Sequence, residues 1–274
     1  CHTISGCIAR SKTALGSSKN WPATFEDTNN ILSANCTLNP FCNDNHVWMP
    51  YCSGDVYLGQ ETKADPFGLL FAGHLSLEAV ITDLQVTHGL GDGTGHSLLL
   101  AGSSAGGLGT FNNADFVTDM LPSVSVKANP QGGFFFPNIT AYPYWAAGAF
   151  EYPENATELE LFDAFRDESC VKEAADPILC NDVFTLYQYI KTPLFVAENQ
   201  YDSNQIFAQL LAPKSGPKTD AFVSYFGSKM REALTQVVAP NGLYAPSCLC
   251  HTSDLNLETA PAVDGVTMGA GLKS

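Results

Sequence analysis

Apolar residues in this chain follow two different spacings, and each spacing predicts a different kind of element. Short continuous apolar runs bounded by Gly or Pro are typical of buried strands, whereas apolar residues three or four positions apart are typical of helices. On this basis we expect strands over 46–52, 97–102, 124–127 and 193–197. We expect helices over 75–88, 105–121, 158–167, 182–190, 203–211 and 220–238.

Strands and helices alternate from residue 75 onward, which predicts an α/β fold with a mainly parallel sheet. The strand over 97–102 is continuously apolar, so we expect it to be buried on both faces. The glycine cluster from Gly89 to Gly95 precedes that strand and is interpreted as a turn. Residues 1–52 are rich in Gly, Ser, Asn and Pro and are expected to consist mostly of loops that lead into the strand over 46–52.

The composition fits a large core and excludes several classes of partner. Hydrophobic residues make up 45% of the 274 positions and charged residues 15%, which excludes a disordered or coiled-coil chain. Lys and Arg total 13 against 28 Asp and Glu, a net charge of −15, so we expect no nucleic-acid partner and no anionic lipid partner. No apolar run approaches the ~20 residues needed to span a membrane. We expect one domain over 1–274 and a monomer.

Nine cysteines and three glycosylation sequons favour a secretory, oxidising compartment. The sequons begin at Asn35, Asn138 and Asn155. The cysteines lack the paired spacing of a zinc module, and their odd number leaves at least one thiol free or paired outside this chain. We expect neither a metal nor another cofactor.

The segment from Gly102 to Gly107 carries the clearest chemical signal. Its sequence is Gly-Ser-Ser-Ala-Gly-Gly, and it follows a predicted buried strand and opens a predicted helix. This is the context of a G-x-S-x-G nucleophile elbow, with Ser104 as nucleophile and the N–H of Ala105 as an oxyanion donor. We expect glycines on both sides of Ser104 because a Cβ there would collide with facing elements. The alternatives are a plain small-residue turn or a phosphate cradle, although no Lys follows as in a P-loop.

A serine nucleophile needs a base and an orienting carboxylate, which in α/β-hydrolases follow in the order Ser, Asp or Glu, His. Asp202 lies just after the strand over 193–197, and it could equally cap the helix that follows. His251 is the one histidine after Asp202, and its alternative is a surface histidine beside a disulfide. A metal site formed with Cys248 and Cys250 is weaker, because two sulfurs one residue apart chelate poorly. The earlier histidines are interpreted as structural: His2, His46, His74, His88 and His96.

An aromatic stretch begins at Phe134 and could belong to the core or to an apolar substrate pocket. The core is the more common place for such residues. We nevertheless take Phe134, Phe135 and Tyr201 as candidate substrate-binding residues.

Several of these segments together resemble the pectin acetylesterase family, to which Notum-type carboxylesterases belong. The resemblance rests on 50–59, on 102–109 followed by Asn113-Ala114-Asp115, on 191–196 with 201–203, and on 245–251. It implies a secreted, disulfide-bonded α/β-hydrolase with a mainly parallel sheet and helices on both faces, which removes acyl groups from carbohydrate or protein. The family's triad falls on Ser104, Asp202 and His251.

Departures from the family pattern shape the remaining expectations. The resemblance implies a glycine run and strand before Cys1, and a Trp-containing segment after the histidine, so we expect the chain to be truncated at both ends. An Asp-Ser-Gly of relatives is replaced by Gln131-Gly132-Gly133. We further expect a disulfide-rich loop region over 1–45 and a cap-like insertion over 130–192.

The function expected is that of a secreted serine esterase. The leading substrate is an O-acetyl group on a cell-wall polysaccharide such as pectin. The alternatives are a Notum-like lipid deacylase and an inactive binding module on the same scaffold.

Overall fold

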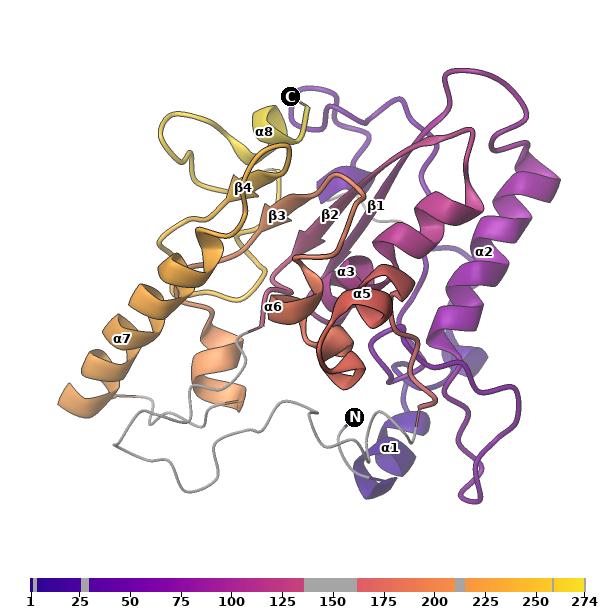
Figure 1. Ribbon diagram of the computed structural model, residues 1–274, viewed down its shortest axis with the longest axis horizontal. Coiled ribbons are helices and arrows are strands. Elements are labelled where there is room, and N and C mark those ends of the chain that lie inside the picture. Colours follow the sequence, from indigo (N-terminus) through magenta and orange to yellow (C-terminus); the bar gives the residue numbers. More distant parts are fainter. Residues whose placement is uncertain (2–3, 26–29, 136–161, 210–214, 258, 274) are drawn as a thin grey trace.

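The computed structural model describes the chain except residues 2–3, 26–29, 136–161, 210–214, 258 and 274. Four parallel strands form its central sheet in the order β1-β2-β3-β4. Their bounds are β1 Ser97–Ser103, β2 Ser125–Gln131, β3 Phe195–Ala197 and β4 Gly242–Tyr244 (Figure 1). The predicted α/β fold with a mainly parallel sheet is therefore confirmed, and the strands end at a common edge, where the functional candidates lie.

The helices follow the predicted order with some changes in length. The α-helices are α1 Ile4–Ser11, α2 Gly73–His88, α3 Ala105–Met120, α5 Glu168–Glu173, α6 Val183–Leu186, α7 Pro217–Leu234 and α8 Met268–Lys273. Three 3-10 helices, η1 Ser18–Asn20, η2 Asn30–Leu32 and η3 Pro177–Asn181, and one π-helix, η4 Asn204–Gln209, complete the described elements. The predictions for α2, α3 and α7 are accurate because these helices carry the longest periodic patterns.

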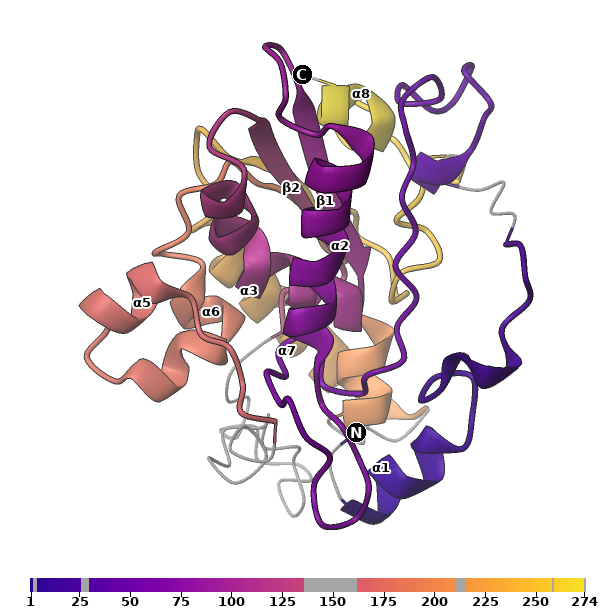
Figure 2. The same cartoon turned by 90° about the vertical axis from the view of Figure 1, so that its right-hand side faces the viewer.

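Two layers of packing cover the two faces of the sheet. Side chains of α3, α6 and α7 form the largest cluster over one face, and α2 joins α3 in a second cluster at the β1 end. On the opposite face, β3 and β4 are covered by α8 and by the segment around Leu255 and Leu257. Figure 2 shows α3, α5 and α6 on one side of the strands and the first part of the chain on the other.

Three expectations about local structure are wrong. Residues 46–52 form no strand, and the described part of the expected helix over 158–167 is not helical. Strand β1 is half-buried along its middle and exposed at both ends, because it is an edge strand of the described sheet with only β2 beside it. Continuous apolar runs do not distinguish an edge strand from a central one.

Three disulfides join cysteines close in sequence: Cys1–Cys7, Cys36–Cys42 and Cys170–Cys180. The sequon residue Asn35 is exposed, whereas Asn138 and Asn155 lie outside the described residues, as does much of the expected cap-like insertion. Of the helices that the structure describes, none has the length and apolar character that a membrane crossing requires.

Candidate active site

The turn between β1 and α3 holds Ser104 in a backbone conformation that side-chain-bearing residues rarely adopt. Its φ is 56° and its ψ is −117°, and its backbone N–H donates to the carbonyl of Gln131 at 2.9 Å. The Ser104 side chain does not cap α3. The hydroxyl therefore stays free to face the carboxyl edge of the sheet.

Close packing requires two glycines at this turn, but not the two expected. A Cβ at Gly102 would overlap the carbonyl oxygen of Gly106. A Cβ at Gly107 would lie 2.6 Å from the Gln131 oxygen and 3.0 Å from the Cα of Gly133. A Cβ at Gly106 would meet nothing within 4 Å. The expected collision is correct for Gly102 and wrong for Gly106, and Gly107 makes the close contact instead.

Asp202 lies in the loop after β3 and is completely buried. Its Oδ1 accepts the backbone N–H groups of Asn204 and Gln205 at 2.8 and 2.9 Å, at the start of the π-helix η4. Its Oδ2 lies 2.6 Å from Nδ1 of His251. The two interpretations of Asp202 from sequence, helix cap and partner of a histidine, are therefore compatible, because each uses a different oxygen.

His251 lies in the loop after β4, and its imidazole connects Asp202 to Ser104. Nε2 lies 2.8 Å from the Ser104 hydroxyl oxygen, although the two residues are 147 positions apart in sequence. The imidazole is 20% exposed, so one side of it remains open. With Nδ1 protonated and donating to Asp202, Nε2 accepts from the hydroxyl and can remove its proton.

Hydrogen bonds connect the loop that carries His251 to the loop that carries Asp202. The side-chain amide of Asn199 donates to the carbonyl of His251 at 2.9 Å and to Asp254 at 2.8 Å. The N–H of Ser203 donates to the carbonyl of Cys250 at 3.2 Å. These contacts fix the imidazole relative to the carboxylate.

Ala105 is the first residue of α3. The first N–H groups of a helix have no acceptor within the helix, and they lie at the positive end of its dipole. The N–H of Ala105 can therefore act as a donor to an anion formed beside the Ser104 hydroxyl.

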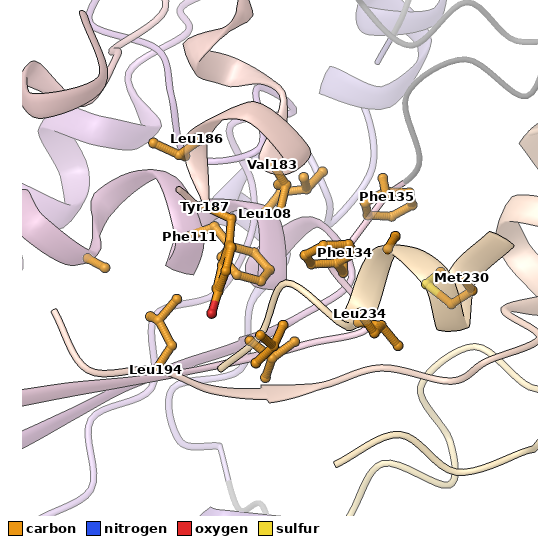
Figure 3. Close-up of a cluster of buried hydrophobic side chains, with 14 of the residues drawn as sticks. Leu108, Phe111, Phe134, Phe135, Val183, Leu186, Tyr187, Leu194, Met230 and Leu234 are labelled. Carbon is orange, nitrogen blue, oxygen red and sulfur yellow. The ribbon is translucent and has the colours of Figure 1, made fainter. Parts of the chain in front are cut away.

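The three candidate substrate-binding aromatics lie in different surroundings. Phe134 is fully buried in the core cluster, and Figure 3 shows it among the side chains of α3, α6 and α7. This burial favours the core interpretation of Phe134 over the pocket. Phe135 is also buried, with its ring centroid 6.4 Å from that of His251. Tyr201 faces α7, where its hydroxyl accepts a hydrogen bond from Arg231 at 3.1 Å.

Sequence reasoning missed Glu198, which is completely buried at the end of β3. Its Oε2 accepts the backbone N–H of Phe134 at 2.8 Å. Burial, and then the nearby carboxylate of Asp202, raise the pKa of Glu198 well above its ordinary value. The signal that could have identified Glu198 is its position: it is an acidic residue directly after a buried strand, four positions before Asp202.

The cysteines near His251 do not form a metal site. Cys52, Cys248 and Cys250 are not disulfide-bonded in the structure. Burial raises the pKa of the Cys248 thiol to about 11, which disfavours the thiolate that binds metals. Across the described ranges, no three His, Cys, Asp or Glu side chains are grouped as metal ligands would be.

The earlier histidines that the structure describes do not contact the triad atoms. His74 is buried, with Nδ1 2.7 Å from the side-chain oxygen of Asn113, and it stacks on Phe165 at 3.9 Å. Nδ1 of His96 accepts the backbone N–H of Gly91 at 2.8 Å. His2 lies outside the described residues.

Comparisons with known proteins agree on one family. Residues 1–271 match the family model described as pectinacetylesterase. The chain is 31% identical to the palmitoleoyl-protein carboxylesterase NOTUM of Drosophila melanogaster over 92% of this chain and 38% of that protein. It is 30% identical to pectin acetylesterase 5 of Arabidopsis thaliana over 79% of this chain and 50% of that protein. The chain thus spans about half or less of these curated relatives.

The fold comparison gives the same family. The crystal structure of the Wnt deacylase Notum from Drosophila superposes with a TM-score of 0.87 at 29% identity, covering 100% of this chain and 80% of that one. The likeness extends over the whole of the sheet and its helices, and the family match covers all but the last residues. The chain belongs to the pectinacetylesterase family.

Proposed function

We propose that this protein is a serine esterase that hydrolyses carboxylic esters outside the cell. The observation that carries the proposal is the unbroken contact from Ser104 Oγ to His251 Nε2 at 2.8 Å and from His251 Nδ1 to Asp202 Oδ2 at 2.6 Å. Family membership supports the proposal, because the relatives compared above are named as carboxylesterases and acetylesterases. The three disulfides support an oxidising, extracellular location.

The reaction begins when Ser104 Oγ attacks the ester carbonyl while Nε2 of His251 takes the hydroxyl proton. The carbonyl oxygen becomes an oxyanion and accepts the N–H of Ala105, while Asp202 stabilises the imidazolium. The C–O bond of the ester then breaks, and His251 returns the proton to the leaving alkoxide. Water, activated by the same imidazole, hydrolyses the acyl-serine to a carboxylic acid and free enzyme.

The substrate that we favour is an O-acetyl ester on a polysaccharide. Phe134 is fully buried in the core and therefore does not line a pocket for a long acyl chain. An acetyl group is small and does not require an aromatic pocket. Because the net charge is −15, we expect a polyanion such as pectin to be a better substrate at acidic pH or high ionic strength than at neutral pH and low salt.

A long-chain acyl ester is the second candidate, and the similarity to proteins named palmitoleoyl-protein carboxylesterase favours it. A chain-length series of p-nitrophenyl esters separates the two. Preference for acetate supports the polysaccharide substrate, and preference for about eight carbons or more supports the lipid.

The test of the activity is Ser104→Ala in this protein. We expect hydrolysis of p-nitrophenyl acetate to fall by at least about 10³-fold, because the nucleophile is removed. A fluorophosphonate probe should label the wild type and leave the variant unlabelled. Equal turnover in the two proteins would exclude Ser104 as nucleophile, and an unlabelled wild type would point to an inactive binding module.

A further inference from the structure

Two carboxyl groups lie side by side in the buried part of this site, and the mechanism above uses only one. Glu198 follows β3 directly, is completely buried, and donates its backbone N–H to the carbonyl of Tyr244 on β4 at 3.0 Å. Its carboxyl and that of Asp202 are both completely buried, four positions apart after the same strand, and Asp202 acts on Glu198 through its charge and as a side-chain hydrogen-bond partner, both of which raise the pKa of Glu198. Both residues lie beyond the end of β3, at the edge of the sheet where the site lies.

The hydrogen-bond donors around the two carboxyls are distributed unequally. Asp202 accepts from the N–H groups of Asn204 and Gln205 on Oδ1 and from His251 on Oδ2. Glu198 accepts from the N–H of Phe134 on Oε2, while its Oε1 is buried and meets no donor among the described residues. The salt bridges found in the described ranges include no Lys or Arg beside either carboxyl.

Two adjacent carboxylates in a water-excluded site cannot both carry a charge at neutral pH, so the pair holds one proton. Three donors stabilise the negative charge on Asp202, whereas one donor faces Glu198. The proton therefore belongs on Glu198, where it converts an oxygen without a donor into a donor. Burial and the Asp202 charge raise the pKa of Glu198, which agrees with this assignment.

We propose that Glu198 is a positioning residue of the triad, whose neutral carboxyl donates a hydrogen bond to the Asp202 carboxylate and fixes its orientation toward His251. Glu198 does not touch the reacting atoms. It restrains the carboxylate plane so that Oδ2 stays aimed at Nδ1 of the imidazole, which the transfer of the Ser104 proton requires. The positioning role rests on the proposed function, because it is a role in catalysis. The protonation of Glu198 does not depend on that function.

The protonation is tested by equilibrium unfolding without substrate. A carboxyl that is protonated when folded and ionised when unfolded binds one more proton in the native state, so its contribution to stability is complete below about pH 4.5 and is lost as the pH rises toward the native pKa. Relative to Glu198→Gln, the wild-type unfolding equilibrium constant should rise about tenfold per pH unit above that point. Glu78→Gln, on the exposed face of α2, measures the effect of removing an exposed carboxyl. A Glu198→Gln difference that stays constant with pH would overturn the protonation.

The positioning role is tested by kinetics on two variants of the same side chain. Glu198→Leu fills the space without a donor, and we expect kcat to fall about 10- to 100-fold with KM unchanged. Glu198→Gln restores an N–H donor and should recover kcat to within about threefold of the wild type. Full activity in Glu198→Leu, or an equal loss in both folded variants, would overturn the role. Neither result would affect the Ser104→Ala test, so the two proposals fail separately.

Discussion

The elbow that carries Ser104 and the loops that carry Asp202 and His251 meet at one sheet edge, but different interactions hold them. The elbow depends on backbone segments in direct contact, where Gly107 of α3 lies against Gly133 beyond β2. The other side depends on hydrogen bonds between loops, including those from Asn199 to the His251 loop.

Because the two sides are held by different interactions, substitutions at the elbow and in the loops should change different properties of the protein. Close backbone contacts leave no room for an added atom, so a change there acts on the folding free energy. Hydrogen bonds between loops contribute modestly to stability but set the position of a side chain to within a fraction of an ångström. Substitutions at the elbow should therefore have their main effect on the unfolding free energy, and substitutions in the loops should also lower kcat.

The largest effect is expected from Asp202→Asn. The amide would donate to Nδ1 of His251, which forces the proton onto Nε2 and removes the base for Ser104, so kcat should fall about 10⁴-fold. The protein should remain folded, because the amide oxygen can still accept the N–H groups of Asn204 and Gln205. Steady-state kinetics on a soluble ester and circular dichroism provide the two measurements.

Asp115→Asn is the matched control for that variant. Asp115 is also a buried carboxylate that accepts backbone N–H groups, those of Lys191 and Thr192, but it contacts none of the triad residues. The Asp115→Asn variant should have a lower unfolding free energy than the wild type, and its folded fraction should keep the wild-type kcat. If the two variants lost kcat equally, the assignment of Asp202 as the partner of the imidazole would be wrong.

The second effect is on stability and comes from Gly107→Ala. The added Cβ would lie 2.6 Å from the Gln131 oxygen, so β2 and α3 must separate, at a cost of about 3 kcal/mol in unfolding free energy. Gly106→Ala is the matched control, because a Cβ there meets nothing within 4 Å. Urea unfolding should distinguish the neighbours, and equal stability in the two would contradict the contact.

The same contrast explains what the sequence could and could not predict. The elbow was predictable because its signal is local: an apolar strand, a Gly-Ser-Ser-Ala-Gly-Gly turn and a helix follow one another within 24 residues, over 97–120. Strand β4 was missed because three residues, Gly-Leu-Tyr, form no periodic pattern. The contacts of Asn199 and Glu198 could not be predicted because they join segments about 50 residues or more apart. The place of Glu198 directly after a strand is a local signal for a site residue, but it does not show which loops meet.

The smallest effect, and the one that tests the loop side most directly, is expected from Asn199→Ala. The variant loses hydrogen bonds of 2.9 and 2.8 Å to His251 and Asp254, which should reduce unfolding free energy by about 1–2 kcal/mol. The imidazole should become less well placed, with kcat about tenfold lower. Chemical denaturation and kcat measured on one preparation give both quantities.

Asn256→Ala is the control for this test, because it also removes side-chain hydrogen bonds near His251 but none that join the two loops. Asn256 also donates two hydrogen bonds from its side chain in the same stretch of chain, to Ser253 and Thr259, but these bonds are exposed to solvent and do not reach the loop of Asp202. Its loss should change stability by less than about 0.5 kcal/mol and leave kcat unchanged. If Asn199→Ala behaved like Asn256→Ala in both assays, the hydrogen bonds between the loops would not be what places the imidazole. The hydrogen bond from the imidazole to Asp202 and that from Ser203 to the carbonyl of Cys250 would then be sufficient to hold it.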